Sequence, residues 1–187
     1  MTCMNLVITG NPGVGKHTIA KHIQNHDSSF EIIDINKFSM DEGLAEKDED
    51  SFEVDVEVLK TKMKEKISSR SLIVGHLAPY VLDEPDVDLV IVLRKNPYQL
   101  IEIYEERGYQ ESKIKQNTGS EILGVIANDA ITSFGKKKSF EIDATDKTPE
   151  VILKRIQDIM NNQENGDIVD WLKLIEEKNE MNKFFDY

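Results

Sequence analysis

The chain has 187 residues, of which 39% are hydrophobic and 31% charged, and its formal net charge is −12. This composition is typical of one α/β domain with an ordinary core, while the acidic balance argues against direct nucleic-acid binding. No apolar run approaches the roughly 20 residues of a membrane span, and the single cysteine, Cys3, excludes an internal disulfide and suits a reducing cytoplasm.

The first predicted element is a strand at residues 4–8, which begins so early that we expect no signal peptide before it. A glycine-rich loop follows, with the sequence Gly-Asn-Pro-Gly-Val-Gly-Lys-His-Thr at residues 10–18. Its glycines let backbone N–H groups surround a phosphate, and the helix that starts near Gly15 points its positive end at the anion. Lys16 is the residue type that reaches β- and γ-phosphates. The expected nucleotide-binding residues here are Gly13, Val14, Gly15, Lys16, His17 and Thr18.

One position of the loop is irregular. The common pattern places Ser or Thr directly after the lysine, where its hydroxyl binds Mg²⁺. Here His17 stands at that position and Thr18 comes next. We expect His17 to contribute its backbone N–H rather than its imidazole. A chance glycine-rich turn is the alternative, but the strand before the loop and the helix after it favour a phosphate site.

Strands and helices alternate along the rest of the chain. Short apolar runs predict four more strands, at residues 31–35, 72–75, 88–93 and 139–143. Helical periodicity and helix-starting prolines predict helices at residues 52–67, 97–107, 114–134, 149–160 and 168–181. The alternation predicts a five-stranded parallel sheet flanked by helices. We expect this domain to span residues 1–162, and a C-terminal helical tail, residues 163–187, to form a packed cover or an interaction segment.

In such sheets, ligands bind at the carboxyl ends of the strands. Asp34 and Asn36 follow the second strand, where an acceptor nucleotide would lie. His76 follows the third strand, and its neutral imidazole could orient the transferred group or a nucleophilic water. Arg94 ends the fourth strand, where it contacts phosphate or forms a structural ion pair.

Further cations follow later in the chain. Arg107 precedes Gly108, which indicates either a simple helix stop or the start of a lid that carries cations onto phosphates. Residues 143–147, which include Lys147, follow the fifth strand and form an adenine pocket or a plain turn. The four histidines lack the spacing of metal ligands, so no direct metal site is expected.

Residues 41–57 form an acidic segment with nine acids and one lysine, Lys47, and carry −8 of the net charge. The segment is either a solvated loop and helix face or a surface for a basic protein partner.

Several short motifs occur in one order along the chain. They are Ile33-Asp34-Ile35-Asn36, Gly75-His76-Leu77, Val92-Leu93-Arg94, Arg107-Gly108-Tyr109, Lys113-Ile114 with Asn117 and Glu121, Ile142-Asp143-Ala144-Thr145, and Lys147-Thr148-Pro149-Glu150-Val151. Together with the loop, in which Thr18 comes two residues after Lys16, they resemble the atypical, nuclear-type (CINAP-like) adenylate kinases and their archaeal relatives. The resemblance covers residues 4–159, and the later Val169-Asp170-Trp171-Leu172 is similar to an archaeal tail element.

The resemblance implies the P-loop nucleotide-kinase fold, with an arm for the nucleoside monophosphate at residues 35–66 and a lid at residues 105–117. It implies a monomer that converts ATP and AMP to two ADP, has weak ATPase activity, and uses Mg²⁺ held through phosphates and water. It further implies a role in small ribosomal subunit maturation through transient binding of a basic platform ribosomal protein. The implied catalytic residues are Lys16, His76 and Arg107. The other implied contacts are Arg94, Arg107 and Lys147 for ATP, and Asp34 and Asn36 for AMP.

Two positions depart from this family. Val74 stands where many members have Asp, and Ile103 where many have Arg. Asp34 is the nearest replacement for the missing carboxylate beside Mg²⁺. Both losses together predict a slow kinase. An ATP-gated assembly factor with little kinase activity, or a kinase of another small acceptor, are the alternatives.

Overall fold

A computed structural model describes residues 4–47 and 52–185 of the chain, so Cys3 lies outside the described residues. Its centre is a five-stranded sheet in the order β2-β5-β1-β6-β7, in which every neighbouring pair is parallel. The strands are β1 (Leu6–Thr9), β2 (Glu31–Asp34), β5 (Ser71–Val74), β6 (Leu89–Arg94) and β7 (Ser139–Asp143). The predicted α/β class and all five sheet strands are thereby confirmed.

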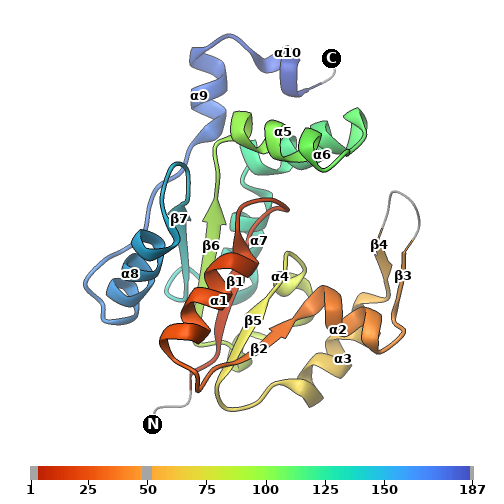
Figure 1. Ribbon diagram of the computed structural model, residues 1–187, viewed down its shortest axis with the longest axis vertical. Coiled ribbons are helices and arrows are strands. Elements are labelled where there is room, and N and C mark those ends of the chain that lie inside the picture. Colours follow the sequence, from red (N-terminus) through yellow and green to blue (C-terminus); the bar gives the residue numbers. More distant parts are fainter. Residues whose placement is uncertain (1–3, 48–51, 186–187) are drawn as a thin grey trace.

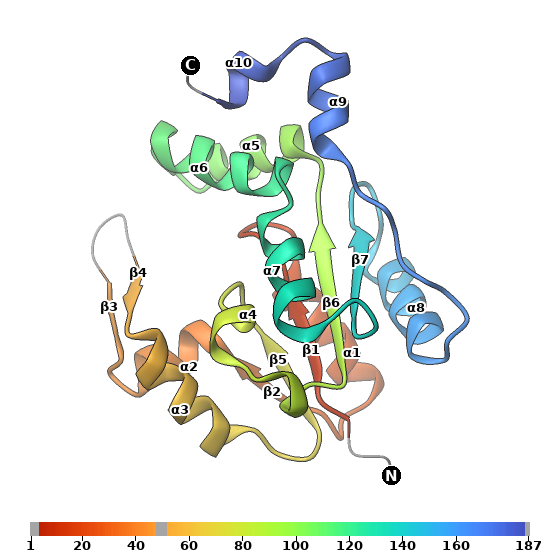
Figure 2. The same cartoon turned by 180° about the vertical axis from the view of Figure 1, so that it is seen from behind.

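Helices cover both faces of the sheet (Figures 1 and 2). The larger helices are α1 (Lys16–His26), α3 (Val56–Lys66), α5 (Pro97–Glu106), α6 (Glu111–Ile122), α7 (Val125–Phe134) and α8 (Pro149–Met160). The shorter ones are α2 (Ile35–Asp41), α4 (Ala78–Val81), the 3₁₀ turn η1 (Glu84–Asp86), α9 (Trp171–Glu177) and α10 (Met181–Phe184). Within the described residues, no helix is long and apolar enough to cross a membrane.

The alternation of side chains along each strand builds two core layers. Leu6 and Ile8 of β1 pack with the apolar face of α1 and α8. Val7 points to the other face, where it packs with α3, α4 and α7. In Figure 1, α1 lies in front of the strands, and Figure 2 shows α7 in front from the opposite side. The buried sheet therefore fixes the start of α1, and with it the glycine-rich loop, at the carboxyl end of β1.

The acidic segment differs from its prediction. A two-stranded antiparallel hairpin, β3 (Ala45–Lys47) and β4 (Phe52–Val54), precedes α3. The helix predicted from residue 52 begins only at Val56, because the Asp55 carboxylate accepts hydrogen bonds from the backbone N–H groups of Glu57 and Val58 and caps it there. Residues 48–51 of the acidic segment lie outside the described residues.

Two long predicted helices are each divided in the structure. The helix predicted at residues 114–134 is α6 and α7, which Gly124 separates with a φ of 64°. The helix predicted at residues 168–181 is α9 followed by the short α10. In both cases the apolar spacing continues across the break, so periodicity alone does not reveal it.

The C-terminal helices α9 and α10 pack on α5 and α6. Ile175 and Phe184 are buried against Ile122 of α6. The ring of Phe184 meets Tyr98 of α5 edge to face, with the centroids 5.3 Å apart. Figure 1 shows α9 and α10 lying beyond the carboxyl end of β6, over α5 and α6. The tail is thus a packed cover at the ligand edge of the sheet.

Candidate functional site

A cavity of about 880 Å³ opens at the carboxyl ends of the central strands. The glycine-rich loop forms its floor, and its walls come from residues after β2 and β5 and from α5, α6 and the start of α7. The predicted site residues that line it are Gly13, Gly15, Lys16, His17, Thr18, Asn36, His76 and Arg107. Tyr80, Gln116, Asn117 and Ser120 also line it, and of these the sequence signalled only Asn117, as part of a motif.

The loop has a backbone shape that only glycine adopts easily. Gly10, Gly13 and Gly15 have φ values of 132°, 85° and 99°. A Cβ atom on Gly10 would lie 2.3 Å from the carbonyl oxygen of Leu93. Val14 is different, because its side chain is buried in the core and only its backbone can face a ligand.

The side chain of Lys16 folds back onto the loop. Its Nζ donates hydrogen bonds to the carbonyl oxygens of Gly10, at 2.9 Å, and Asn11, at 2.8 Å. Burial lowers the pKa of Lys16 from 10.5 to about 8. The ammonium is therefore still charged at neutral pH, and a phosphate oxygen can replace the two carbonyl partners.

His76 lies beside this ammonium on the cavity wall. Burial, followed by the positive charge of Lys16, lowers the pKa of His76 to about 4. At neutral pH its imidazole is therefore uncharged and has one hydrogen-bond donor and one acceptor. This is the state that was expected for a residue that orients a reacting group.

His17 and Asp34 form a hydrogen bond of 2.6 Å between Nε2 and Oδ2. The imidazole of His17 thus has a partner of its own, in addition to any role of its backbone N–H. The other oxygen of Asp34 accepts from the backbone N–H groups of Asn36 and Lys37 and caps α2. Burial raises the pKa of Asp34, but these hydrogen bonds outweigh it, and the pKa is lowered overall.

The hydrogen bonds of Asp34 limit how this carboxylate could take part in Mg²⁺ binding. Both oxygens of Asp34 are engaged, and the described residues contain no cluster of three or more His, Cys, Asp or Glu side chains that could hold a metal. Because both oxygens of Asp34 already accept hydrogen bonds and Asp34 does not line the cavity, an Mg²⁺ ion bound there would be held through phosphates and water rather than by this carboxylate.

Two amide groups at the cavity are buried with no hydrogen-bond partner among the described residues. They are Oδ1 of Asn36, beside β2, and Nδ2 of Asn117, on α6. An unpaired buried polar atom costs about 1–3 kcal/mol. A ligand that supplies a donor to Asn36 and an acceptor to Asn117 would remove both costs.

The end of α5 places cationic and aromatic groups over the cavity. Arg107 directly follows α5 as its C-cap residue, and Lys113 of α6 lies with its Nζ 4.6 Å from the ring centre of Tyr109. Tyr109 stacks on Tyr104, whose hydroxyl donates to the carbonyl oxygen of Pro12 at 2.6 Å. This chain of contacts ties the predicted lid to the glycine-rich loop.

Arg94 does not line the cavity, and the structure shows the ion-pair alternative. Its Nε donates to Glu121 Oε1 at 2.8 Å, its Nη2 to the Glu121 carbonyl oxygen at 2.6 Å, and its Nη1 to Glu141. The Arg94 side chain is 4% exposed, so these buried partners occupy it. The expectation that Arg94 contacts a phosphate is therefore corrected.

Lys147 also lies away from the residues that line the cavity. Its Nζ is 3.8 Å from Asp143 Oδ2, and the backbone N–H of Thr145 donates to Asp143 Oδ1 at 2.9 Å. Asp146 follows with a φ of 52°. Residues 143–147 thus form a turn that does not line the cavity, and the adenine pocket there stays a prediction.

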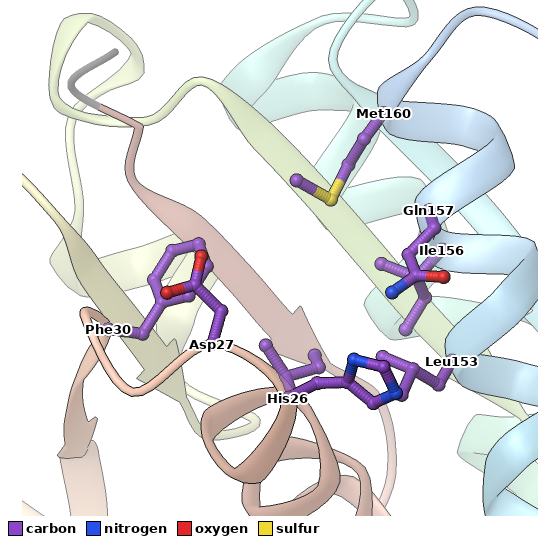
Figure 3. A pocket seen from close by; sticks show the side chains of 8 residues that line it. His26, Asp27, Phe30, Leu153, Ile156, Gln157 and Met160 are labelled. Carbon is purple, nitrogen blue, oxygen red and sulfur yellow. The ribbon is translucent and has the colours of Figure 1, made fainter. Parts of the chain in front are cut away.

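A second, smaller cavity of about 100 Å³ lies between the end of α1 and α8 (Figure 3). His26, Asp27 and Phe30 line one side of it, and Leu153, Gln157 and Met160 the other. Its volume is below the roughly 300 Å³ at which small-molecule sites begin. No predicted site residue lines it, so it is a gap in packing rather than a candidate site.

Known proteins resemble this chain over most of its length. The model of a family described as an AAA domain matches residues 6–124. A protein named putative adenylate kinase from Pyrococcus furiosus is 33% identical over 177 residues, which covers 93% of this chain and 94% of the relative. Its namesake from Saccharolobus islandicus is 35% identical over 172 residues, or 90% of this chain and 88% of the relative.

A solved structure has the same fold as this chain. The shikimate kinase from Bacteroides thetaiotaomicron superimposes with a TM-score of 0.54 over 84% of this chain and 98% of that one. The two sequences are 14% identical, so the likeness concerns the fold alone. A kinase-type P-loop architecture is therefore shared.

Proposed function

Because the chain belongs to the AAA-domain family and to the family of archaeal proteins named putative adenylate kinase, we propose that it converts ATP and AMP to two molecules of ADP. One observation carries the proposal. Lys16, His76 and Arg107 line a single cavity together with the glycine-rich loop and Asn36. The cavity volume of about 880 Å³ lies near the upper end of the roughly 300–1,000 Å³ that small-molecule sites span.

In this reaction an oxygen of the AMP α-phosphate attacks the γ-phosphorus of ATP. The bond between that phosphorus and the β–γ bridging oxygen breaks, and ADP leaves with the electron pair. Such transfer depends on positioning and on neutralisation of charge. Mg²⁺, when bound to the phosphates, supplies part of that neutralisation.

The residues of the chain supply the rest. Lys16 leaves the carbonyl oxygens of Gly10 and Asn11 to bind the β- and γ-phosphates, and the loop N–H groups surround the same phosphates. Arg107 reaches the transferred group from the lid, residues 105–117. Neutral His76 hydrogen-bonds the transferred phosphoryl group or the attacking oxygen.

The acceptor lies on the other wall of the same cavity. Residues 35–66 form the arm that binds AMP. Within this arm, Asn36 contacts AMP through its buried Oδ1. Asp34 holds the start of α2 and, through His17, the start of α1. These bonds keep the AMP arm and the ATP-binding loop at a fixed position relative to each other.

Two apolar positions make the enzyme slow. Val74 ends β5, and its buried apolar side chain offers no carboxylate that could bind the water shell of Mg²⁺. Ile103 lines the cavity where a second arginine would neutralise phosphate charge. Loss of one such donor costs about 10²–10³ in kcat in other enzymes.

The proposal extends to a cytoplasmic role in small ribosomal subunit maturation. The acidic segment, residues 41–57, carries −8 of the net charge and would transiently bind a basic small-subunit ribosomal protein. ATP hydrolysis would then drive release. The second candidate is an assembly factor in which this ATP cycle is the main activity, and the same acidic segment favours it.

A coupled assay that measures ADP from ATP and AMP tests the enzyme, with Lys16→Ala as the matched control. ADP formation that does not exceed the control would overturn the kinase. Omission of AMP measures ATPase activity, and a panel of other acceptors tests the third alternative, another small substrate.

A pull-down of the basic ribosomal protein, with and without ATP, tests the partner. Binding in only one nucleotide state supports the gated assembly role. If no binding occurs in either state, the assembly role fails while the kinase proposal stands.

A further inference from the structure

Glu121 of α6 is fully buried, and its carboxylate joins three separate parts of the chain. Its Oε1 accepts hydrogen bonds from Arg94 Nε at 2.8 Å, from the backbone N–H of Lys95 at 3.0 Å and from Trp171 Nε1 at 3.1 Å. Its Oε2 accepts from Asn11 Nδ2 at 2.7 Å. A buried carboxylate is tolerated only when its oxygens accept hydrogen bonds, so each of these bonds stabilises the buried charge.

Asn11 connects this carboxylate to the glycine-rich loop. Its side chain is used entirely on α6, because Oδ1 accepts from Ser120 Oγ at 3.0 Å while Nδ2 donates to Glu121. Its carbonyl oxygen holds the Lys16 ammonium at 2.8 Å. The position of Glu121 therefore sets the position of the loop residue that contacts Lys16.

Trp171 connects the same carboxylate to the C-terminal segment. It is the first residue of α9, where the Asp170 carboxylate caps the helix by accepting from the Lys173 N–H at 2.9 Å. Its indole N–H has Glu121 as its acceptor. In Figure 1 this part of the chain passes from α8 alongside β7 to α9 at the ligand edge.

The segment is anchored before it reaches Trp171. The backbone N–H of Asp167 donates to the Glu141 carbonyl oxygen at 2.8 Å, and the Asp167 carboxylate accepts from Arg155 Nη1 at 2.6 Å. Gly166 has a φ of 75°, and a Cβ there would lie 2.7 Å from the Glu141 oxygen. This close approach indicates a built connection rather than a loose tail.

We propose that Glu121 and Trp171 are positioning residues through which the C-terminal segment, residues 166–185, holds the glycine-rich loop in its nucleotide-binding shape. The inference rests on the proposed function only in requiring that the loop binds ATP. By linkage, whatever the docked segment adds to ATP affinity, bound ATP adds to the docking of the segment. Loss of the Trp171 bond therefore weakens ATP binding without any contact between Trp171 and the nucleotide.

The first experiment measures the ATP dissociation constant by calorimetry for three proteins: the wild type, Trp171→Phe and Phe184→Leu. Trp171→Phe keeps an aromatic ring but removes the donor to Glu121, and we expect a dissociation constant raised about fivefold or more. Phe184→Leu is the matched control, because it weakens packing of the same segment without touching Glu121. It should lower Tm and leave the dissociation constant unchanged, because the folded protein keeps the bond from Trp171 to Glu121.

A double-mutant cycle tests the route. If Trp171 acts through Glu121 and Asn11, Trp171→Phe should have little further effect on ATP affinity in an Asn11→Ala background. Trp171 is the only tryptophan of the chain, so its fluorescence reports on this bond directly. ATP should change its emission in the wild type, and the change should be lost in Asn11→Ala.

The outcomes separate the two proposals. An equal ATP dissociation constant in the wild type and Trp171→Phe, or an equal loss of affinity in both backgrounds, overturns the positioning role and leaves the kinase intact. A wild type that binds no ATP in the calorimeter overturns the proposed function, and the positioning role with it.

Discussion

Nε2 of His17 lies 2.6 Å from Oδ2 of Asp34, so the first turn of α1 is hydrogen-bonded to the end of β2. The two ends belong to the two halves of the cavity, because α1 carries the phosphate loop and β2 leads into the proposed AMP arm. The His17 side chain is 58% exposed, and such pairs contribute only about 0.2–1 kcal/mol. Its importance therefore concerns geometry more than stability.

Substitutions at this pair should separate stability from acceptor binding. His17→Ala should lower the free energy of unfolding by less than about 1 kcal/mol. Asp34→Ala should cost about 1–3 kcal/mol, because it also removes the cap of α2. Both should raise KM for AMP more than KM for ATP. Urea unfolding and steady-state kinetics measure these quantities, and an effect confined to KM for ATP would contradict the assignment of the arm.

The same carboxylate gives a pH dependence. The pKa of Asp34 is lowered on folding, since its hydrogen bonds outweigh burial. As the pH falls, Asp34 is therefore protonated first in the unfolded chain. The stabilisation that the Asp34 carboxylate gives the folded state is complete above its unfolded pKa of 3.8 and is lost as the pH falls through its folded pKa. Asp34→Asn should flatten the stability profile below about pH 4. A profile identical to that of the wild type would show that this carboxylate does not contribute.

Lys16 is predicted to destabilise the nucleotide-free protein. Its pKa falls from 10.5 to about 8 on folding, so the unfolded chain binds more protons between these values and stability rises with pH across that window. The buried charge costs at most about 3 kcal/mol at neutral pH. Lys16→Met should therefore raise Tm without ATP and abolish the further rise that ATP produces. A lower Tm in Lys16→Met without ATP would show that its bonds to Gly10 and Asn11 outweigh its burial.

His76 should act as a neutral hydrogen-bonding group. Because its pKa is about 4, it does not titrate between pH 5 and 7, and kcat/KM should show no acid limb from this residue there. His76→Gln should retain activity within about tenfold of the wild type, whereas His76→Ala should lose about 10²-fold or more. An acid limb near pH 6.5 that His76→Gln removes would instead identify a charged imidazole.

Much of the fold could be predicted from local sequence. The strands and the loop are visible because apolar runs and glycine spacing are local signals. The division at Gly124 was missed because apolar side chains continue on both sides of it. The β3–β4 hairpin was missed because its strands are only three residues long and lie within the acidic segment, whose charges also favour solvated helix ends.

The candidate site was predictable where it follows strand ends, and not where distant residues meet. His76 and Asn36 were found from their positions after β5 and β2. The ion pair of Arg94 with Glu121 joins residues far apart in sequence, and nothing near Arg94 distinguishes a phosphate ligand from a buried partner. The bond from Trp171 to the same carboxylate depends on tertiary packing in the same way.

Ile103 and Val74, the two positions that we propose slow the enzyme, should respond differently to substitution. Ile103 lines the cavity, with its Cγ2 3.3 Å from where a Cβ on Gly13 would lie, so an arginine there can extend toward the phosphates without entering the core. Ile103→Arg should raise kcat about tenfold or more, since one well-placed donor is worth about 10²–10³. Ile103→Met, which has similar bulk and no charge, is the control, and equal rates in the two variants would contradict the explanation of slow turnover.

Val74 is the harder position to restore. It is fully buried among Leu6, Ile8 and Leu72, so Val74→Asp would place a carboxylate in an apolar layer. Burial of an unpaired charge costs several kcal/mol, and we expect Val74→Asp to lower Tm strongly. Mg²⁺ with ATP should recover part of that loss, because the ion would compensate the new charge, whereas ATP with EDTA should not. Equal Tm recovery with and without Mg²⁺ would show that position 74 does not face the metal's water shell, and the slow rate would then rest on Ile103 alone.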